Sequence, residues 1–137
     1  MFLWMQWIRL DRRNWIRGGS SINKRQVGSE YETMAINFLE GHGVKVTERN
    51  FRTRFGEIDI IGYDGEYIVF FEVKYRKDER KGNPAEALSY KKCHTICRVA
   101  DFYRMKCGIG EFAPMRFDVV AICGAQIQWY RNAFEYC

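Results

Sequence analysis

The chain has 137 residues, of which 47% are hydrophobic and 16% aromatic, enough for one domain with a real core. This composition excludes a chain that is disordered throughout. Lys and Arg outnumber Asp and Glu by 22 to 17, a net charge of +5, which suits a polyanionic partner but does not by itself establish one.

Residues 1–23 are expected to form a loosely ordered extension. Residues 1–10 are apolar and aromatic, but the charges from Arg9 onward leave this run far too short to span a bilayer. Positive charge follows the apolar run, whereas in a signal peptide it comes first. An interfacial amphipathic anchor that uses Trp4, Trp7, Trp15 and several arginines is the alternative. With no spanning segment and five cysteines that form no CxxC pair, we expect a cytoplasmic protein with free thiols.

The domain proper, residues 24–137, is expected to begin with a helix. Apolar side chains recur at helical spacing from Val27 to Leu39. The Gly41-His42-Gly43 segment ends this helix with residues that tolerate left-handed backbone geometry. Glu32 falls at the border of the apolar face, between core and solvent.

Three strands are expected next, over 44–53, 57–62 and 67–75. The first is the most polar, which is typical of a strand at the edge of a sheet. Asp64-Gly65 lies between the other two, and Asp-Gly flanked by β-prone runs is a strong hairpin signal.

A second helix is predicted from Asn83 to about Lys106. Asn83 is a suitable N-cap, Pro84 suits the first helical position, and Glu86 completes a capping box. Two final strands are expected over 116–122 and 125–130, with Asp118 as a buried, hydrogen-bonded structural acid. The predicted order of helix, three strands, helix and two strands indicates an α/β fold, a central mixed sheet flanked by helices.

The predicted hairpin brings acidic side chains together. A turn at Asp64-Gly65 places Asp59 opposite Phe70 and diagonal to Glu72. In this register four charged side chains project from one face of the hairpin: Glu57, Asp59, Glu72 and Lys74.

Carboxylates beside apolar residues are costly unless they are paired or bind a metal ion. Oxygen ligands suit Mg²⁺ or Mn²⁺, and such an ion can polarise a phosphate and activate a water. Lys74 is then placed to orient the water or to neutralise charge that develops on the phosphate. The alternative is a structural Glu72–Lys74 pair on a solvated face. The apolar run from Tyr67 to Val73 argues for a strand covered on both faces and so favours the metal site.

Six sequence blocks, in the same order along the chain, resemble the YraN-type family of predicted endonucleases, and the resemblance extends over about residues 26 to 134. The blocks are Glu48-Arg49-Asn50-Phe51-Arg52, Glu57-Ile58-Asp59-Ile60-Ile61, Val69-Phe70-Phe71-Glu72-Val73-Lys74-Tyr75-Arg76, Pro84-Ala85-Glu86-Ala87, Arg116-Phe117-Asp118-Val119-Val120 and Arg131-Asn132-Ala133-Phe134. Two positions depart from the pattern: Tyr31 stands where the family usually has Gly, and Tyr75 where a small hydroxyl residue is common.

The resemblance implies a restriction-endonuclease-like fold with an αβββαβ core, a member of the PD-(D/E)xK superfamily that is similar to archaeal Holliday-junction resolvases. It implies that Asp59, Glu72 and Lys74 are the core catalytic residues. Glu32 matches the family's helical glutamate, a further ligand for metal or water. The implied activity is hydrolysis of phosphodiester bonds in nucleic acid, with DNA, branched DNA included, as the expected substrate and Mg²⁺ or Mn²⁺ as cofactor.

Basic residues flank the hairpin and are predicted to contact phosphates: Arg52, Arg54, Arg76 and Lys77. A merely solvated charged loop is the alternative for them. The sequence also leaves open a non-catalytic nucleic-acid-binding module of the same fold, and an adaptor that uses the Trp-rich extension. A homodimer is an option because a junction needs two cuts, although no motif specifies an interface.

Overall fold

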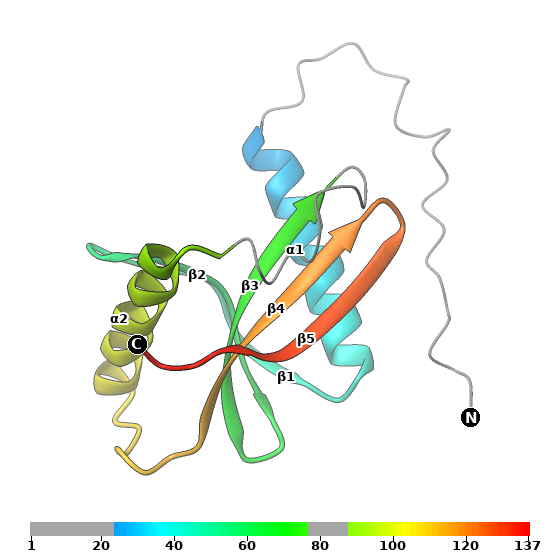
Figure 1. The fold of residues 1–137 in the computed structure, drawn as a ribbon. Helices are drawn as coiled ribbons and strands as arrows, with labels where there is room; N and C mark the ends of the chain where they lie inside the picture. Colours follow the sequence, from blue (N-terminus) through cyan, green and yellow to red (C-terminus); the bar gives the residue numbers. More distant parts are fainter. Residues whose placement is uncertain (1–23, 77–87) are drawn as a thin grey trace.

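The computed structural model describes residues 24–76 and 88–137, which fold as helix, three strands, helix and two strands (Figure 1). The elements are α1 (Lys24–Gly41), β1 (Lys45–Thr53), β2 (Gly56–Asp64), β3 (Tyr67–Arg76), α2 (Tyr90–Lys106), β4 (Met115–Cys123) and β5 (Gln126–Phe134). This order confirms the predicted αβββαβ core. The predicted extension and Lys77 lie outside the described residues. Within the described ranges, no helix has the length and apolar character needed to cross a membrane.

The five strands form one sheet in the order β1-β2-β3-β4-β5. Neighbouring strands are antiparallel except β3 and β4, which are parallel. The sheet is therefore mixed, as predicted, and β1 is an edge strand. A parallel pair needs a crossover connection, and α2 lies in the segment that joins β3 to β4.

The two helices cover opposite faces of the sheet (Figure 1). On the α1 face, Leu39 packs in a cluster with Val69 and Phe71. On the α2 face, Val99 packs in a cluster with Phe70. β3 is thus covered on both sides, which explains its continuous apolar run.

The β2–β3 hairpin has a different register from the predicted one. Asp64 pairs with Tyr67, so that Gly65 and the residue after it form the turn, and Gly65 adopts a φ of +60°. Ile61 consequently lies opposite Phe70, where the predicted turn placed Asp59. The predicted partners are wrong by two residues, because the glycine takes the first turn position instead of the second.

The second helix begins later than predicted. Ser89 is its N-cap, with an extended backbone (φ −69°, ψ 154°) and an Oγ that accepts the N–H of Lys92 at 3.1 Å. A helix that runs unbroken from Pro84 is therefore wrong. Serine is among the strongest N-caps because its hydroxyl satisfies a free N–H of the first turn. The Asn83 capping signal lies outside the described residues.

Candidate functional site

The candidate site forms where β2 and β3 separate. The two strands pair only as far as Ile60–Phe71, after which β2 stays paired with β1 and curves towards α2, whereas β3 runs on (Figure 1). In the gap, the backbone N–H of Val73 donates to Oδ2 of Asp59 at 2.8 Å. The Asp59 carboxylate thus takes the place of a strand carbonyl and is held between the strands.

The pKa of the Asp59 carboxyl is strongly shifted. Burial and the charges of Glu72 and Glu32 raise its pKa from 3.8 to about 7, against the hydrogen bond from the Val73 N–H, which lowers it. Both acids therefore lie within electrostatic reach of Asp59. A carboxyl group with a pKa shifted this far is more frequent at functional sites than elsewhere.

Glu72 lies on the α2 face of β3 beside two lysines. Its side chain is 7% exposed, and Oε1 is 3.4 Å from Nζ of Lys74 and 3.6 Å from Nζ of Lys92, in the first turn of α2. Glu72 and Lys74 thus form the ion pair of the structural alternative, but on a buried carboxylate and not on a solvated face. The side chain of Glu57 is 46% exposed and pairs instead with Arg52 at 3.1 Å.

Glu32 approaches Asp59 from α1, on the other side of the sheet. Its Oε2 accepts the side-chain amide of Asn50 at 2.7 Å and lies 3.4 Å from Nε of Arg49. Asn50 has a φ of 52°, a left-handed conformation that asparagine tolerates better than most residues. In the β1–β2 ladder it falls between Arg49–Ile60 and Phe51–Ile58, which sets it across from Asp59.

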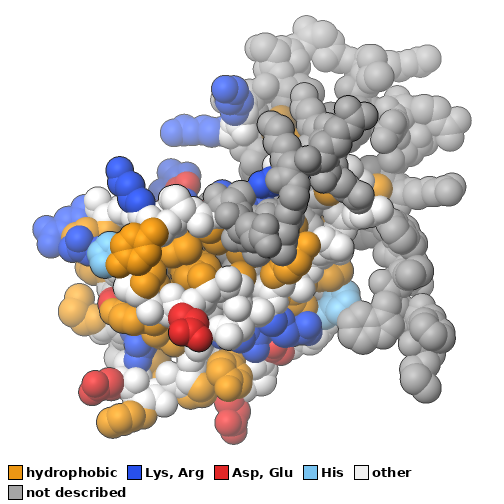
Figure 2. Space-filling view, in the orientation of Figure 1, with side chains coloured by type: hydrophobic (Ala, Val, Ile, Leu, Met, Phe, Trp, Pro, Cys, Tyr) orange, Lys and Arg blue, Asp and Glu red, His pale blue; other side chains and the backbone are white. Residues whose placement is uncertain are grey.

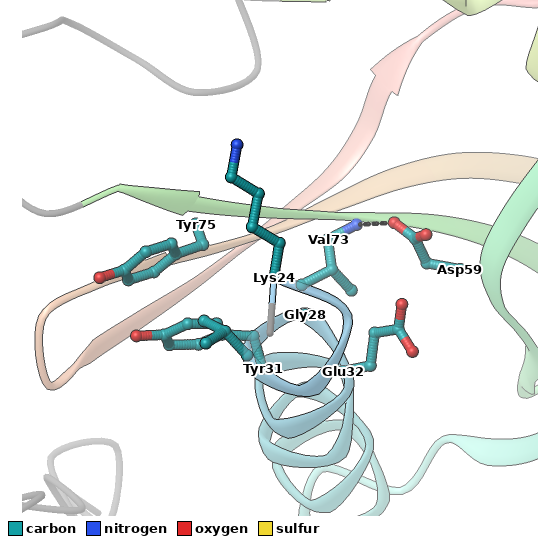
Figure 3. Close-up of a pocket in the computed structure, with 8 residues that line it drawn as sticks. Lys24, Gly28, Tyr31, Glu32, Asp59, Val73 and Tyr75 are labelled. Atoms are coloured by element: carbon teal, nitrogen blue, oxygen red, sulfur yellow. Dashed lines mark hydrogen bonds between the residues drawn. The ribbon is translucent and has the colours of Figure 1, made fainter. Parts of the chain in front are cut away.

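A pocket of about 230 Å³ opens beside Asp59 on the α1 side. One helical face of α1 supplies Lys24, Val27, Gly28, Tyr31 and Glu32, and β3 supplies Val73 and Tyr75. Figure 3 shows the carboxylates of Asp59 and Glu32 directed into the same space. The predicted charged residues therefore do not share one flat face: Asp59 faces α1, and it reaches Glu72 on the α2 face through the gap.

The carboxylate oxygens of Asp59 and Glu32 are donors of the type that Mg²⁺ and Mn²⁺ prefer, but they do not form a complete site. In the described parts of the chain, no three His, Cys, Asp or Glu side chains are grouped so that they could hold an ion by themselves. Mg²⁺ commonly takes only one or two carboxylates, and waters and substrate phosphates complete its coordination. A cation at Asp59 would also offset the burial and the acidic neighbours that raise the pKa of this group.

The predicted phosphate contacts lie at two separate places. Arg52 and Arg54 are at the tip of the β1–β2 hairpin, and the Arg54 guanidinium lies 4.9 Å from the ring centre of Phe55. Arg76 ends β3. Figure 2 shows one face of the molecule, on which Lys and Arg side chains gather along the upper left margin. Below them, hydrophobic, basic and acidic side chains are interspersed.

Sequence reasoning missed two residues of the site. Asn50 lies in a block that carries the family resemblance, and an asparagine within a predicted strand was the available signal for an irregular backbone. Lys92 has no such signal, because its contact with Glu72 depends on where α2 begins and docks.

Comparison with known proteins gives the family. The model of the "Uncharacterised protein family UPF0102" matches residues 31–122. A UPF0102 protein of Lachnoclostridium phytofermentans is 40% identical over 114 residues, which cover 83% of this chain and 97% of that protein. A UPF0102 protein of Photobacterium profundum is 45% identical over 114 residues, 81% of this chain and 91% of that one. The chain therefore belongs to the UPF0102 family, the YraN family that its motifs resemble.

Proposed function

We propose that this protein is a metal-dependent endonuclease that hydrolyses phosphodiester bonds of nucleic acid, with DNA as the expected substrate. The observation that carries the proposal is the Asp59 carboxylate, held in the gap between β2 and β3 with its pKa raised by burial and by Glu72 and Glu32. Burial and the two neighbouring acids destabilise the ionised form of Asp59, and a bound cation would compensate for both effects.

Asp59 and Glu72 would hold the ion, and Glu32 would ligate it or orient the attacking water. The Val73 N–H fixes Oδ2 of Asp59, and Asn50 and Arg49 fix Glu32. A bound Mg²⁺ would polarise the scissile phosphate and lower the pKa of a water.

Lys74 supplies the cationic group of the proposed reaction. Its Nζ lies beside Glu72 and is partly exposed. From there it stabilises the charge that develops on the phosphate oxygens as water attacks.

The decisive test compares Asp59→Asn, Glu72→Gln and Lys74→Met with the wild type in cleavage of duplex, single-stranded and branched DNA with Mg²⁺ or Mn²⁺. We expect each substitution to lower the rate about a hundredfold or more, because each removes a group that acts on the transition state. Glu57→Gln is the matched control, an acid of the same hairpin that pairs with Arg52 outside the site. Full cleavage by Asp59→Asn contradicts the proposal.

Calorimetric titration with Mn²⁺ tests metal binding independently of DNA cleavage. We expect heat of binding in the wild type and none in the Asp59→Asn/Glu72→Gln double variant, with both proteins folded by circular dichroism.

One observation favours a second candidate, a nucleic-acid-binding module without catalysis. Two lysines lie within 4.0 Å of Glu72, and they can neutralise this carboxylate without an ion. Metal-independent DNA binding that weakens steeply with salt, together with no cleavage of any substrate, would support this alternative.

A further inference from the structure

The pocket beside Asp59 contains an aromatic pair that hydrolysis of a phosphodiester does not require. The rings of Tyr31 and Tyr75 are stacked, with centroids 3.8 Å apart and planes at 19°. Both line the same pocket as Asp59 and Glu32 (Figure 3). The pair therefore stands next to the position where the scissile phosphate would bind.

The two tyrosines differ in burial in a way that suits a binding platform. Tyr31 is 6% exposed and packs in the α1-side core, whereas Tyr75 is 38% exposed. Burial and a hydrogen bond with Tyr75 raise the pKa of the Tyr31 hydroxyl. Tyr31 thus covers one face of the Tyr75 ring and holds it in place, and the exposed part of Tyr75 offers an aromatic surface that loses little freedom when a ligand stacks on it.

The space around this pair is sufficient for one aromatic ring system. The pocket volume is about 230 Å³, and an apolar cavity of about 150 Å³ already admits benzene. Gly28 keeps the helix side open, since nothing lies within 4 Å of the position that a Cβ would occupy there. Lys24 adds a cation to the rim of the same pocket, suited to a phosphate of the ligand.

We propose that this pocket receives one unpaired nucleobase of the substrate, stacked against Tyr75, while the neighbouring phosphate lies at Asp59. The inference deepens the proposed function by naming the substrate class: single strands, or duplexes with an unpaired nucleotide at the cut. Every base has a π-face, so such stacking tolerates any sequence. A base inside an intact duplex must first leave its stack.

Fluorescence anisotropy with Ca²⁺ in place of Mg²⁺ is designed to measure binding without cleavage. The probes are a labelled short single strand, its blunt duplex and the duplex with one unpaired nucleotide. We expect the single strand and the interrupted duplex to bind more tightly than the blunt duplex. Tyr75→Leu is expected to weaken their binding about five- to hundredfold, the range for loss of one stacked base, and to leave the blunt duplex unchanged. Tyr75→Phe keeps the ring and retains wild-type affinity.

Two further variants guard against a merely structural effect. Gly28→Leu fills the pocket without removing a tyrosine or an acid, and it is expected to weaken single-strand binding as Tyr75→Leu does. Tyr67→Leu is the matched control, since Tyr67 is a 45% exposed tyrosine at the other end of the same strand, and it keeps wild-type affinity.

The inference and the proposed function fail in different ways. Equal affinity of the wild type for single strand and blunt duplex, no binding of either, or unchanged affinity in Tyr75→Leu overturns the inference. Cleavage of DNA without dependence on Tyr75 leaves the nuclease proposal standing alone. Binding that depends on Tyr75, with no cleavage of any substrate, supports the base pocket and contradicts the nuclease.

Discussion

At the scale of single residues, burial of the Asp59 carboxyl group disfavours its ionised form. Its pKa is raised to about 7, first by burial and then by Glu72. The proton is therefore held more tightly in the folded chain than in the unfolded one, where the ordinary value is 3.8. This group contributes most to stability below about pH 4, and the contribution is lost as the pH rises through about 7.

Without divalent ions, we therefore expect the free energy of unfolding to fall between about pH 5 and about pH 8. The fall should be smaller in Asp59→Asn, which cannot ionise, and Glu57→Gln should behave as the wild type. Urea unfolding in EDTA at the two pH values measures this difference. If the free energy of unfolding fell equally with pH in wild type and in Asp59→Asn, the pKa of Asp59 would not be raised by folding.

Metal binding should show the opposite trend with pH. A divalent ion competes with the proton for Asp59, so the Mn²⁺ affinity of the wild type is expected to rise as the pH passes about 7. Calorimetric titrations across this range test the expectation, and an affinity independent of pH would contradict it.

Lys92 provides a test of the second carboxylate. Its Nζ lies 3.6 Å from Oε1 of Glu72 and the side chain is 37% exposed. We expect Lys92→Met to tighten Mn²⁺ binding about two- to fivefold, because a partly solvated positive charge beside the ligand is removed. Lys91→Met, a neighbour on the same turn, is the control, and weaker Mn²⁺ binding in Lys92→Met would contradict the assignment of Glu72 as a ligand.

At the scale of elements, the backbones of β1 and β2 approach each other closely at Gly62. At Gly62, a Cβ would lie 2.7 Å from the backbone oxygen of Lys45. Gly62 pairs with Val46 and Val69 in the ladders on either side. A side chain there would push the edge strand away from β2.

Gly62→Ala is therefore expected to destabilise the fold by about 1–3 kcal/mol, as overpacking of a tight contact does. Gly28→Ala should instead stabilise it by about 0.5–1 kcal/mol, because Gly28 is inside α1 with open space around it. Urea denaturation of both variants measures the two effects. The same sign in both would refute the packing argument.

The elements were predictable from the sequence more fully than their junctions. Periodicity and turn residues predict all seven elements, and the alternation along β3 places Glu72 and Lys74 on one side. The prediction of the β2–β3 register was wrong at Asp64-Gly65, since a single glycine with positive φ fits either turn position. The predicted start of α2 was wrong because Asn83 and Ser89 are both suitable N-caps. The Asp59 side chain points towards α1 because the pairing of β2 with β3 ends next to it. No local sequence pattern indicates where that pairing ends.

At the scale of the whole molecule, a second buried acid shows what a purely structural carboxylate looks like. Asp118 is 0% exposed, as predicted for a structural acid. It accepts hydrogen bonds from Nε of Arg116 at 2.9 Å, from Nε1 of Trp129 at 2.8 Å and from the N–H of Asn132 at 2.9 Å. Arg116 also binds Asp64 at 2.7 Å. This network ties β4 to β5 and to the β2–β3 hairpin.

Replacing the two acids should therefore have opposite consequences. Asp118→Asn is expected to cost about 3–5 kcal/mol of stability, because Arg116 loses its buried partner. Asp59→Asn is expected to be neutral or stabilising near neutral pH without metal. Parallel urea titrations compare them, and similar losses in both would mean that Asp59 is as well satisfied as Asp118.

The crossover between β3 and β4 has a consequence for the order of folding. Asp59 and Glu72 belong to one hairpin, so they meet through a local contact that forms quickly, whereas Lys92 arrives only when α2 docks across the sheet. We expect Lys92→Met to leave the folding rate almost unchanged and to alter mainly the unfolding rate, measured by stopped-flow fluorescence, because the Lys92–Glu72 contact forms late. The helix that joins the parallel pair also brings a positive charge to Glu72, so a long-range step of folding sets the charge balance of the site.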